Sequence, residues 1–406
     1  MDLPDVLSPC ANVRRTCKLL LESDAKDRSV SIDSEALDAL GTTIANIVQS
    51  QKQKSGESSS SEVQSLLTEE SCVHNLEFAA WDEFQWHYNA ENYSRTSLNE
   101  HVQHQRFERI ALYILVMDTI NFCFWPKSNV KNDGQVNLLE YEHLASALKI
   151  LAEKDDVLDH DCGNTMIAED SYAFAPQNLI KLTPETFLSM MTPLMPNDVD
   201  YVIPNVQERV RLLNEMGQAL LTFHRGSATY FIAQSKRSAD LMVYHILESF
   251  SGFRDTAIDK DGRLIAFYKR AQILVADLWA ALGSEKGEDK YGKNLCNFDD
   301  MEKITMFPDY RIPQLLRSMD VLTYSQQLGD KVDNKIELEA FCMDELYIRA
   351  ATVVAVDLLV ENVKSKIEKD KDINAVKMDW YLWNLGEQLD RQGKLSPHHR
   401  VRTIFY

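Results

Sequence analysis

Apolar side chains recur at helical spacing through most of this chain. In residues 205–224 they return every three or four positions, and Gly226 follows where such a helix would end. The triplet at 183–185, Thr-Pro-Glu, is typical of a helix start. The same spacing predicts helices in 11–22, from Ser34 onward, and in 138–152, 238–250, 267–282, 335–367 and 378–389. Because no series of alternating strands is visible, we expect an all-α fold, with at most a few short strands, in a single domain over residues 1–406.

The most hydrophobic stretch covers residues 107–125. It is almost continuously apolar, so periodicity does not separate a buried helix from a buried strand, but its length favours a helix. Asp118 and Asn121 lie inside it, and polar groups in such a place need hydrogen-bond partners. Two interpretations stay open: a satisfied structural pair, or a polar floor beneath a ligand.

The composition fits a helical globular protein. The chain has 406 residues, of which 45% are hydrophobic, and its 14 glycines and 11 prolines argue against an all-β chain with many turns. Residues 51–62 are poor in apolar side chains and rich in serine, which predicts a disordered surface insertion. Residues 155–161 are acidic and predict a solvated linker, since the spacing of a calcium-binding loop is absent.

The formal net charge of −19 predicts a generally acidic surface. Such a surface repels phosphate backbones, so no stable nucleic-acid partner is expected. The seven cysteines are scattered, which is typical of a reducing compartment. The first residues lack the features of a secretory signal, and the longest apolar runs, of about eight residues, are too short to cross a bilayer. We therefore expect a cytoplasmic or nuclear protein without a membrane partner.

Familiar catalytic motifs are missing from the sequence. It has no Gly-rich dinucleotide fingerprint, no phosphate-binding loop, no GxSxG and no HExxH. His398 and His399 form a pair without further ligands nearby in the sequence, so neither a metal nor a cofactor is expected. Carboxylates, a few cations, histidines and aromatic rings remain. These groups suit a reaction whose transition state carries positive charge on a sugar, with rings stacking on a flat base.

One short turn concentrates charged side chains. Asp309 and Arg311 flank a tyrosine, with Pro308 before them and Pro313 after them. Proline restricts its own backbone and that of the preceding residue, so the pattern predicts a stiff turn that leads into a helix near Pro313. The turn is either a helix entry whose charges cap and pair, or a rigid ligand site.

The predicted helix of residues 267–282 begins with two cations. Lys269 and Arg270 oppose the helix dipole there, at a cost of a few tenths of a kcal/mol each and up to about 1. An anion facing them would offset that cost, although a lysine can also extend along apolar surface to reach water. Asp277 lies two turns further on among apolar residues and needs a partner.

Five motifs carry a resemblance to a known family. They are FYKRAQILVAD (267–277), ITMFPDYRIPQ (304–314), DTINFCFW (118–125), RDTAI (254–258) and the ending MDWYLWN…HHRVRTIFY. They closely resemble the queuosine salvage protein family, and the likeness runs from about residue 10 to the C-terminus in the same order along the chain. The resemblance implies an all-α fold similar to helix-hairpin-helix DNA glycosylases. It also implies hydrolysis of a small-molecule substrate, queuosine 5′-phosphate, at the bond between queuine and ribose 5-phosphate, so that queuine can return to tRNA.

The resemblance also implies roles for single residues. Asp309 corresponds to the family's catalytic aspartate, which stabilises an oxocarbenium-like transition state or attacks the anomeric carbon. Phe307 would line the base site, and Asp379 would accept a hydrogen bond from the base or its amine. His87, within an aromatic cluster, matches a family histidine near the base on a looser alignment. From the residues alone, that cluster reads as core with a wet edge or as a ligand platform.

Five further candidates are less specific. Lys269 and Arg311 are chosen for the phosphate from charge alone. Tyr310, Asp118 and Phe122 belong to the family motifs and are expected to bind substrate, although core packing explains them equally well.

The alternative function is that of a non-catalytic helical protein that binds nucleic acid or another protein. An enzyme needs a concave site where Asp309, Lys269 and aromatic side chains converge, whereas an adaptor would present an exposed apolar groove. We expect the enzyme, acting as a monomer on a free nucleotide.

Overall fold

The computed structural model describes the chain in eight segments. They comprise residues 8–23, 28–50, 100–125, 136–161, 172–195, 200–283, 294–367 and 373–406. Helices dominate these segments, and each of the six strands found there is three residues long. The predicted all-α fold with a few short strands is confirmed. His87 and the predicted insertion at 51–62 lie outside the described residues.

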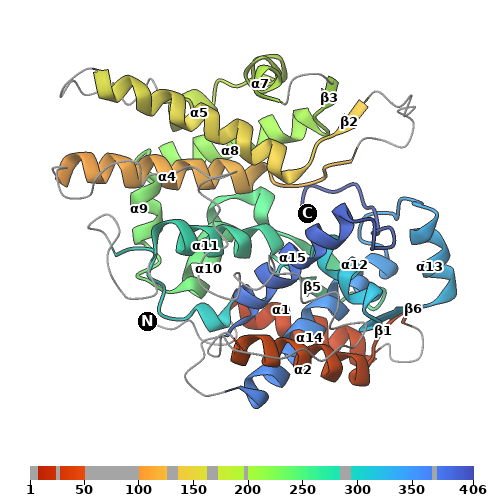
Figure 1. The fold of residues 1–406 in the computed structure, drawn as a ribbon. Coiled ribbons are helices and arrows are strands. Elements are labelled where there is room, and N and C mark those ends of the chain that lie inside the picture. Colours follow the sequence, from red (N-terminus) through yellow and green to blue (C-terminus); the bar gives the residue numbers. More distant parts are fainter. Residues whose placement is uncertain are drawn as a thin grey trace.

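The upper part of the molecule in Figure 1 is built around α4. Helices α5 and α8 both pack against α4, and the short α6 packs on α8. The bounds of this group are α4 (Glu100–Ile120), α5 (Tyr141–Asp161), α6 (Pro176–Leu179), α7 (Pro184–Met191), the 3-10 turn η3 (Thr192–Leu194), α8 (Val206–Phe223) and α9 (Ala228–Ala233).

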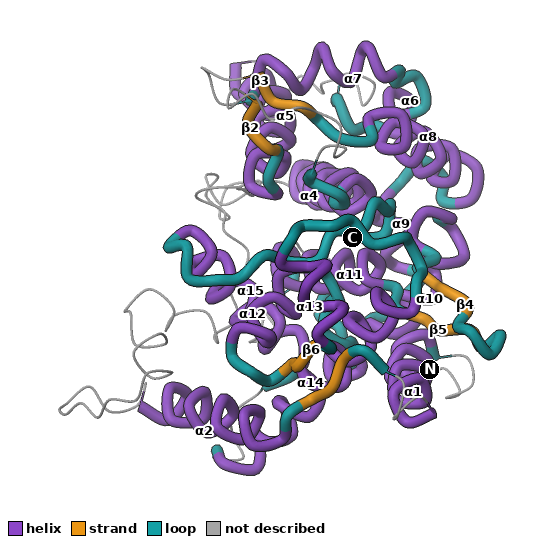
Figure 2. The backbone as a smooth tube through the Cα atoms, turned by 90° about the vertical axis from the view of Figure 1, so that its right-hand side faces the viewer, coloured by secondary structure: helices purple, strands orange, loops and turns teal. Residues whose placement is uncertain are grey.

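The remaining helices form a middle and a lower level. The middle level holds α10 (Ala239–Ser249), α11 (Lys269–Leu282), α12 (Arg311–Ser318) and α15 (Ala375–Arg391), with the 3-10 turns η4 (Ser251–Phe253) and η5 (Met301–Lys303). The lower level holds α1 (Pro9–Ser23), α2 (Ser34–Ser50) and α14 (Met343–Lys366), and α13 (Gln326–Asp333) lies at the side of the middle level, next to α12. The view turned by 90° in Figure 2 keeps the order of these levels. Helix α11 contacts α4 above and α10 beside it, so it links the upper and middle levels.

Three pairs of short strands join segments of the chain. Strand β1 (Val30–Ile32) pairs antiparallel with β6 (Leu322–Tyr324), β2 (Val136–Leu138) parallel with β3 (Asp200–Val202), and β4 (Thr256–Ile258) antiparallel with β5 (Leu264–Ala266). The β4–β5 hairpin leads directly into α11. At this junction the carbonyl of Asp255 accepts the amides of Phe267 and Tyr268 at 3.0 and 3.2 Å, which fixes where α11 begins.

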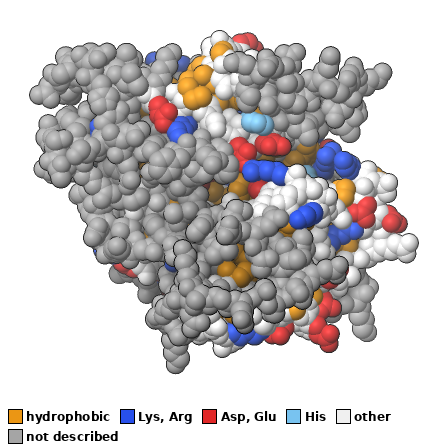
Figure 3. All heavy atoms as spheres, in the orientation of Figure 1, with side chains coloured by type: hydrophobic (Ala, Val, Ile, Leu, Met, Phe, Trp, Pro, Cys, Tyr) orange, Lys and Arg blue, Asp and Glu red, His pale blue; other side chains and the backbone are white. Residues whose placement is uncertain are grey.

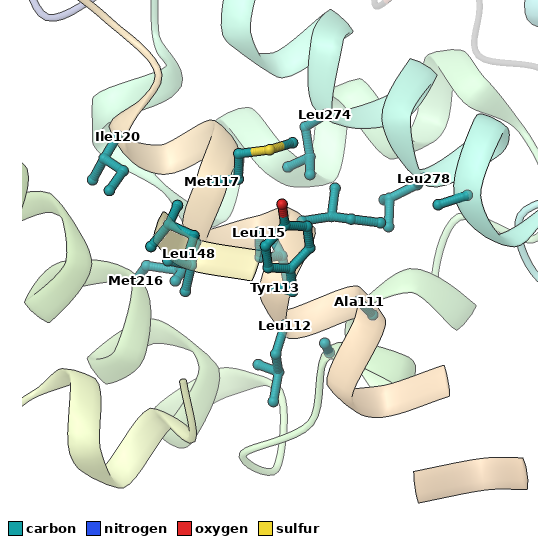
Figure 4. Packing of buried hydrophobic residues seen from close by; sticks show 14 of the residues in the cluster. Ala111, Leu112, Tyr113, Leu115, Met117, Ile120, Leu148, Met216, Leu274 and Leu278 are labelled. Atoms are coloured by element: carbon teal, nitrogen blue, oxygen red, sulfur yellow. The ribbon is translucent and has the colours of Figure 1, made fainter. Parts of the chain in front are cut away.

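Buried apolar side chains form two main clusters, one around α4 and α11 and the other around α14. Every residue from Ile110 to Met117 is buried, and Figure 4 shows Met117 with Leu274 and Leu278 of α11 in the same part of the core. Burying one such side chain contributes about 1.5–3 kcal/mol. The predicted buried helix is therefore confirmed as far as Ile120, where α4 ends.

Several helix boundaries differ from the predicted ones. Helix α2 begins at Ser34, but Asp33 caps it, because Asp33 Oδ1 accepts the amides of Glu35 and Ala36, both at 2.9 Å. Helix α12 begins at Arg311 instead of near Pro313. Proline is tolerated there because amides of the first helical turn have no partner within the helix.

The acidic linker predicted at residues 155–161 is wrong. Helix α5 continues through this stretch to Asp161. A continued helix satisfies the backbone hydrogen bonds that a linker would leave to water. The predicted cap at Thr183 is confirmed, and Ser238 caps α10 in the same way, since each side chain accepts a backbone amide of the helix that it precedes.

Candidate active site

A pocket with a cavity of about 110 Å³ lies between α11, α15 and the turn before α12. Among the described residues that line it are three carboxylates, Asp277, Asp309 and Asp379, and one cation, Lys269. Aromatic rings supply much of the remaining wall. On the face drawn in Figure 3, acidic and basic side chains also gather at the level of α15.

Asp309 both caps a helix and faces the pocket. Its Oδ1 accepts the backbone amides of Arg311 and Ile312 at 3.0 and 3.1 Å, which satisfies two amides at the start of α12. Its Oδ2 makes no hydrogen bond within the described segments. Burial raises the pKa of Asp309, while Lys269 and the two capped amides favour the ionised form. The two interpretations of this turn, helix entry and ligand site, are therefore compatible.

The turn that carries Asp309 is held by side chains of two helices, α11 and α14. Gln272 of α11 binds Thr305 through its amide, accepting the backbone N–H of Thr305 and donating to its hydroxyl, both at 2.8 Å. Arg349 of α14 donates from Nε to the carbonyl of Pro308 at 3.1 Å. Gln272, Thr305 and Arg349 are all buried, and Pro308 directly precedes Asp309. The position of the Asp309 carboxylate is therefore fixed by packing and hydrogen bonds as well as by the turn.

Asp379 of α15 joins the same turn from the far side of the pocket. Its Oδ1 accepts the amide of Phe307 at 2.8 Å, and its side chain is 3% exposed. Burial raises the pKa of Asp379 well above its ordinary value, and the negative charge of Asp309 raises it further. Trp383 follows Asp379 by four residues and also lines the pocket, as the spacing of a helix face requires.

Helix α11 presents one face to the pocket. Lys269, Ile273 and Asp277 are spaced by four residues, and all three line the cavity. The Lys269 amine makes no hydrogen bond or ion pair with any residue that the structure describes. Burial lowers the pKa of Lys269, and Asp309 is the carboxylate that most favours its charged form.

Ring-to-ring contacts hold the aromatic walls. Tyr141 of α5 meets Trp383 edge to face with 6.0 Å between ring centres. Trp380 stacks on Trp279 at 5.9 Å with 15° between their planes. Tyr310 packs against the His398 ring at 4.6 Å. Such pairs contribute about 0.5–1.5 kcal/mol beyond burial, so the walls are stiff enough to accept a flat ligand.

The predicted site residues separate into two groups. Lys269, Phe307, Asp309, Tyr310 and Asp379 line one pocket. Other residues that were not predicted line the same pocket, among them Asp277 and Trp383. The available signal was helical spacing, because Asp277 follows Lys269 by two turns and Trp383 follows Asp379 by one.

Arg311, Asp118 and Phe122 are not among the residues that line the pocket. The guanidinium of Arg311 donates to Glu387 and Gln314, both at 2.7 Å, and pairs with Asp390 at 2.8 Å. Its predicted contact with a phosphate stays a prediction, for which the guanidinium would have to be shared with these partners.

Phe122 is completely buried between two arginines. Their guanidinium carbons lie 4.6 Å (Arg209) and 5.1 Å (Arg270) from the centre of its ring. Asp118 is also fully buried, and neither of its carboxylate oxygens has a hydrogen-bond partner of ordinary geometry in the described segments. The side chain of Asn121 nevertheless acts on Asp118 and lowers its pKa, so the structural pair and the polar floor beneath a ligand both stay predictions.

Within the described segments, neither a metal-binding cluster nor a membrane-spanning helix is found. No group of three or more histidine, cysteine, aspartate or glutamate side chains there is arranged to hold a metal ion. Among the same residues, no helix is long and apolar enough to cross a membrane. The pocket can bind a small, flat molecule between rings and place buried carboxylates against positive charge.

Together, these features define a helical protein with a small-ligand pocket suited to stabilising a cation. A family model described as queuosine salvage protein matches residues 100–406. The chain therefore belongs to the queuosine salvage protein family.

Named relatives agree with this assignment. A protein of Dictyostelium discoideum is 39% identical over 300 residues, covering 74% of this chain and 79% of the relative. One from Sphaerobacter thermophilus is 34% identical over 307 residues (74% and 82%), and one from Bos taurus is 32% identical over 304 residues (74% and 82%). Each of the three is named queuosine 5′-phosphate N-glycosylase/hydrolase.

Proposed function

We propose that this protein hydrolyses the N-glycosidic bond of queuosine 5′-phosphate and releases queuine for salvage into tRNA. The activity in the names of its relatives supports the choice of substrate. The observation that carries the mechanism is Asp309, whose Oδ2 is left without a partner in an aromatic-walled pocket while Oδ1 anchors the carboxylate to α12.

Asp309 stabilises the sugar cation. As the bond to the base breaks, positive charge develops at the anomeric carbon, and a fixed carboxylate beside it lowers the barrier. The anchored Oδ1 removes the need to reorient the side chain during the reaction. Lys269 favours the ionised form of Asp309, which this role requires.

Asp379 and Phe307 bind the base. The amide of Phe307 occupies Oδ1 of Asp379, and the other oxygen accepts a donor of the base or its side-chain amine. The rings of Phe307 and Trp380 lie on the wall of the same pocket, where a flat base stacks. The acidic surface of the chain favours a free nucleotide over a polymer, and we expect the monomer to be active.

The non-catalytic alternative predicts an exposed apolar groove in place of this pocket. The convergence of Asp309, Lys269 and aromatic rings on one cavity favours the enzyme. Incubation with queuosine 5′-phosphate, followed by mass spectrometry for free queuine, separates the two functions directly, because an adaptor releases none.

An Asp309→Asn variant tests the role of the carboxylate. Asparagine keeps an oxygen that can cap α12, so the fold is retained while the charge is lost. Removing one preorganised group of this kind lowers kcat by about 10²–10³-fold. Asp33→Asn is the matched control, since Asp33 caps α2 in the same way but is exposed and outside the pocket. A folded Asp309→Asn variant with the parent's rate would refute the assignment.

A further inference from the structure

One buried and one partly buried carboxylate lie behind the proposed catalytic centre, where α4 packs against α11. Asp277 lines the pocket from α11, and its side chain makes no hydrogen bond within the described segments. Asp118 of α4 is 0% exposed, and both of its oxygens are without a partner of ordinary geometry there. A fully ionised carboxylate in such surroundings is strongly disfavoured unless a cation pairs with it.

No described cation forms an ion pair with either carboxylate. The two terminal nitrogens of Arg270 donate to backbone carbonyls, those of Asp118 and Thr119 at 3.0 and 2.5 Å and that of Gly252, and its charge favours ionised Asp118 without a direct ion pair. Lys269 acts on both carboxylates only from a longer distance and is shared with the other acids of the pocket. The charged and titratable groups around the pair are Lys269 and Arg270 on α11, Asp309 on the turn, Asp379 on α15, Tyr113 on α4 and Tyr141 on α5.

We propose that Asp118 and Asp277 share one proton at neutral pH, and that Asp277 donates this proton to the base as the glycosidic bond breaks. The proposal rests on the proposed function. Because α4 packs directly on α11, each carboxylate acts on the other. Two like charges that interact in a site with little water do not both form readily, so one carboxyl of such a pair keeps its proton. Because only Asp277 reaches the cavity, it is the catalytic residue, and Asp118 is a positioning residue that acts through it.

With this assignment, the proton that the base gains and the proton that water loses are both accounted for. The bond between the anomeric carbon and the base nitrogen breaks, and its electron pair leaves with the base. The base takes the proton from the Asp277 carboxyl. Water then adds its oxygen to the anomeric carbon beside Asp309, and the proton that this water loses restores the Asp118–Asp277 pair. No oxidant, metal or further reactant is needed.

The titration behaviour of the two groups agrees with this geometry. Burial raises the pKa of Asp277 to about 7, with Lys269 acting in the opposite direction. Burial and then the charge of Asp277 raise the pKa of Asp118 well above its ordinary value. A group with a raised pKa keeps its proton up to that pH and loses it above, so the activity is expected to fall on the alkaline side.

The first experiment uses the ligand-free protein. Infrared difference spectra recorded against pH detect the carbonyl band of a buried protonated carboxyl. In the parent we expect a band that persists to about neutral pH, and that both Asp277→Asn and Asp118→Asn remove or shift. Asp261→Asn, a change in an exposed hairpin residue, is the control and should leave the band unchanged. Spectra of Asp277→Asn that retain the parent's band at neutral pH would overturn the proposal.

The second experiment measures kcat against pH with queuosine 5′-phosphate. Asp277→Asn should lower kcat by about 10²–10⁴-fold, the usual contribution of a general acid, and abolish the alkaline limb. Asp118→Asn removes the like charge, so the alkaline limb should move to lower pH, which a purely structural role would not produce. An Asp277→Asn variant that raises KM but keeps the parent's kcat and alkaline limb refutes the proton transfer. If the parent releases no queuine at all, the proposed function fails, whereas the infrared result still decides whether the pair holds a proton.

Discussion

The ion pair between Arg349 and Asp255 offers a sharp test of how the site is held. Arg349 is 1% exposed and donates to both oxygens of Asp255, at 3.0 and 2.5 Å. Its guanidinium lies between the rings of Phe267 and Tyr406, 4.0 and 4.4 Å from their centres. Because its Nε also binds the carbonyl of Pro308, the pair connects α14 to the turn that carries Asp309.

The perturbation is Arg349→Met, which keeps much of the side-chain volume but removes the charge. Asp255 is 1% exposed, so the change leaves a buried carboxylate without its cation, which costs about 3–5 kcal/mol of unfolding free energy. The carbonyl of Pro308 also loses its donor, at about 1 kcal/mol. The matched control is Arg317→Met. Arg317 also binds both oxygens of an aspartate, Asp333, and lies over a ring, but its pair is partly exposed, so the loss should be about 0.2–1 kcal/mol.

Urea denaturation of the two variants and the parent measures both losses. We expect Arg349→Met to lose several times more stability than Arg317→Met, and to lose activity under conditions where it remains folded, because the Pro308 carbonyl is released. Equal losses in the two variants would refute the argument from burial. Full activity in folded Arg349→Met would show that the pair does not position the turn.

Three further outcomes are expected. In Gly386→Ala the new Cβ would lie 2.9 and 3.0 Å from Cγ and Cδ of Arg311, so a stability loss of about 1–3 kcal/mol is expected in urea denaturation. Lys269→Met removes the cation that favours ionised Asp309, so the acidic limb of the kcat profile should move to higher pH. His399 is buried, which lowers its pKa to about 3, so the unfolded chain binds a proton there before the folded one. The unfolding free energy of the parent should therefore fall relative to His399→Gln by up to about 1.4 kcal/mol per pH unit as the pH drops from about 6.5 to about 4.

The helices could be predicted from the sequence because their signals are local. A helix is indicated by apolar positions at helical spacing, by a Thr or Ser before them and by a glycine after them. All of these signals lie within the few turns of chain that form the helix. The boundaries were less predictable where two local signals compete. Pro313 indicated a helix start, but the cap supplied by Asp309 places the start at Arg311.

The site was predictable only in part. The resemblance pointed to Asp309, Phe307 and Asp379, and the two cations at the start of α11 drew attention to Lys269. The spacing of residues did not show that Asp255 would pair with Arg349, since 94 positions separate them. Nor did it show that Asp118 and Asp277 lie on helices that pack against each other, because the contact of α4 with α11 joins distant parts of the chain.

The two cations that oppose the dipole of α11 have different explanations. Arg270 donates to the carbonyls of Asp118 and Thr119 near the end of α4. Arg209 donates to the carbonyls of Ile120, Phe122 and Cys123. The last carbonyls of a helix lack partners within it and carry its negative end, so two buried guanidinium groups serve there as a cap. The anion that Arg270 faces is thus the end of a neighbouring helix. Lys269, one position earlier, makes no such contact, and its charge remains available to the carboxylates of the pocket.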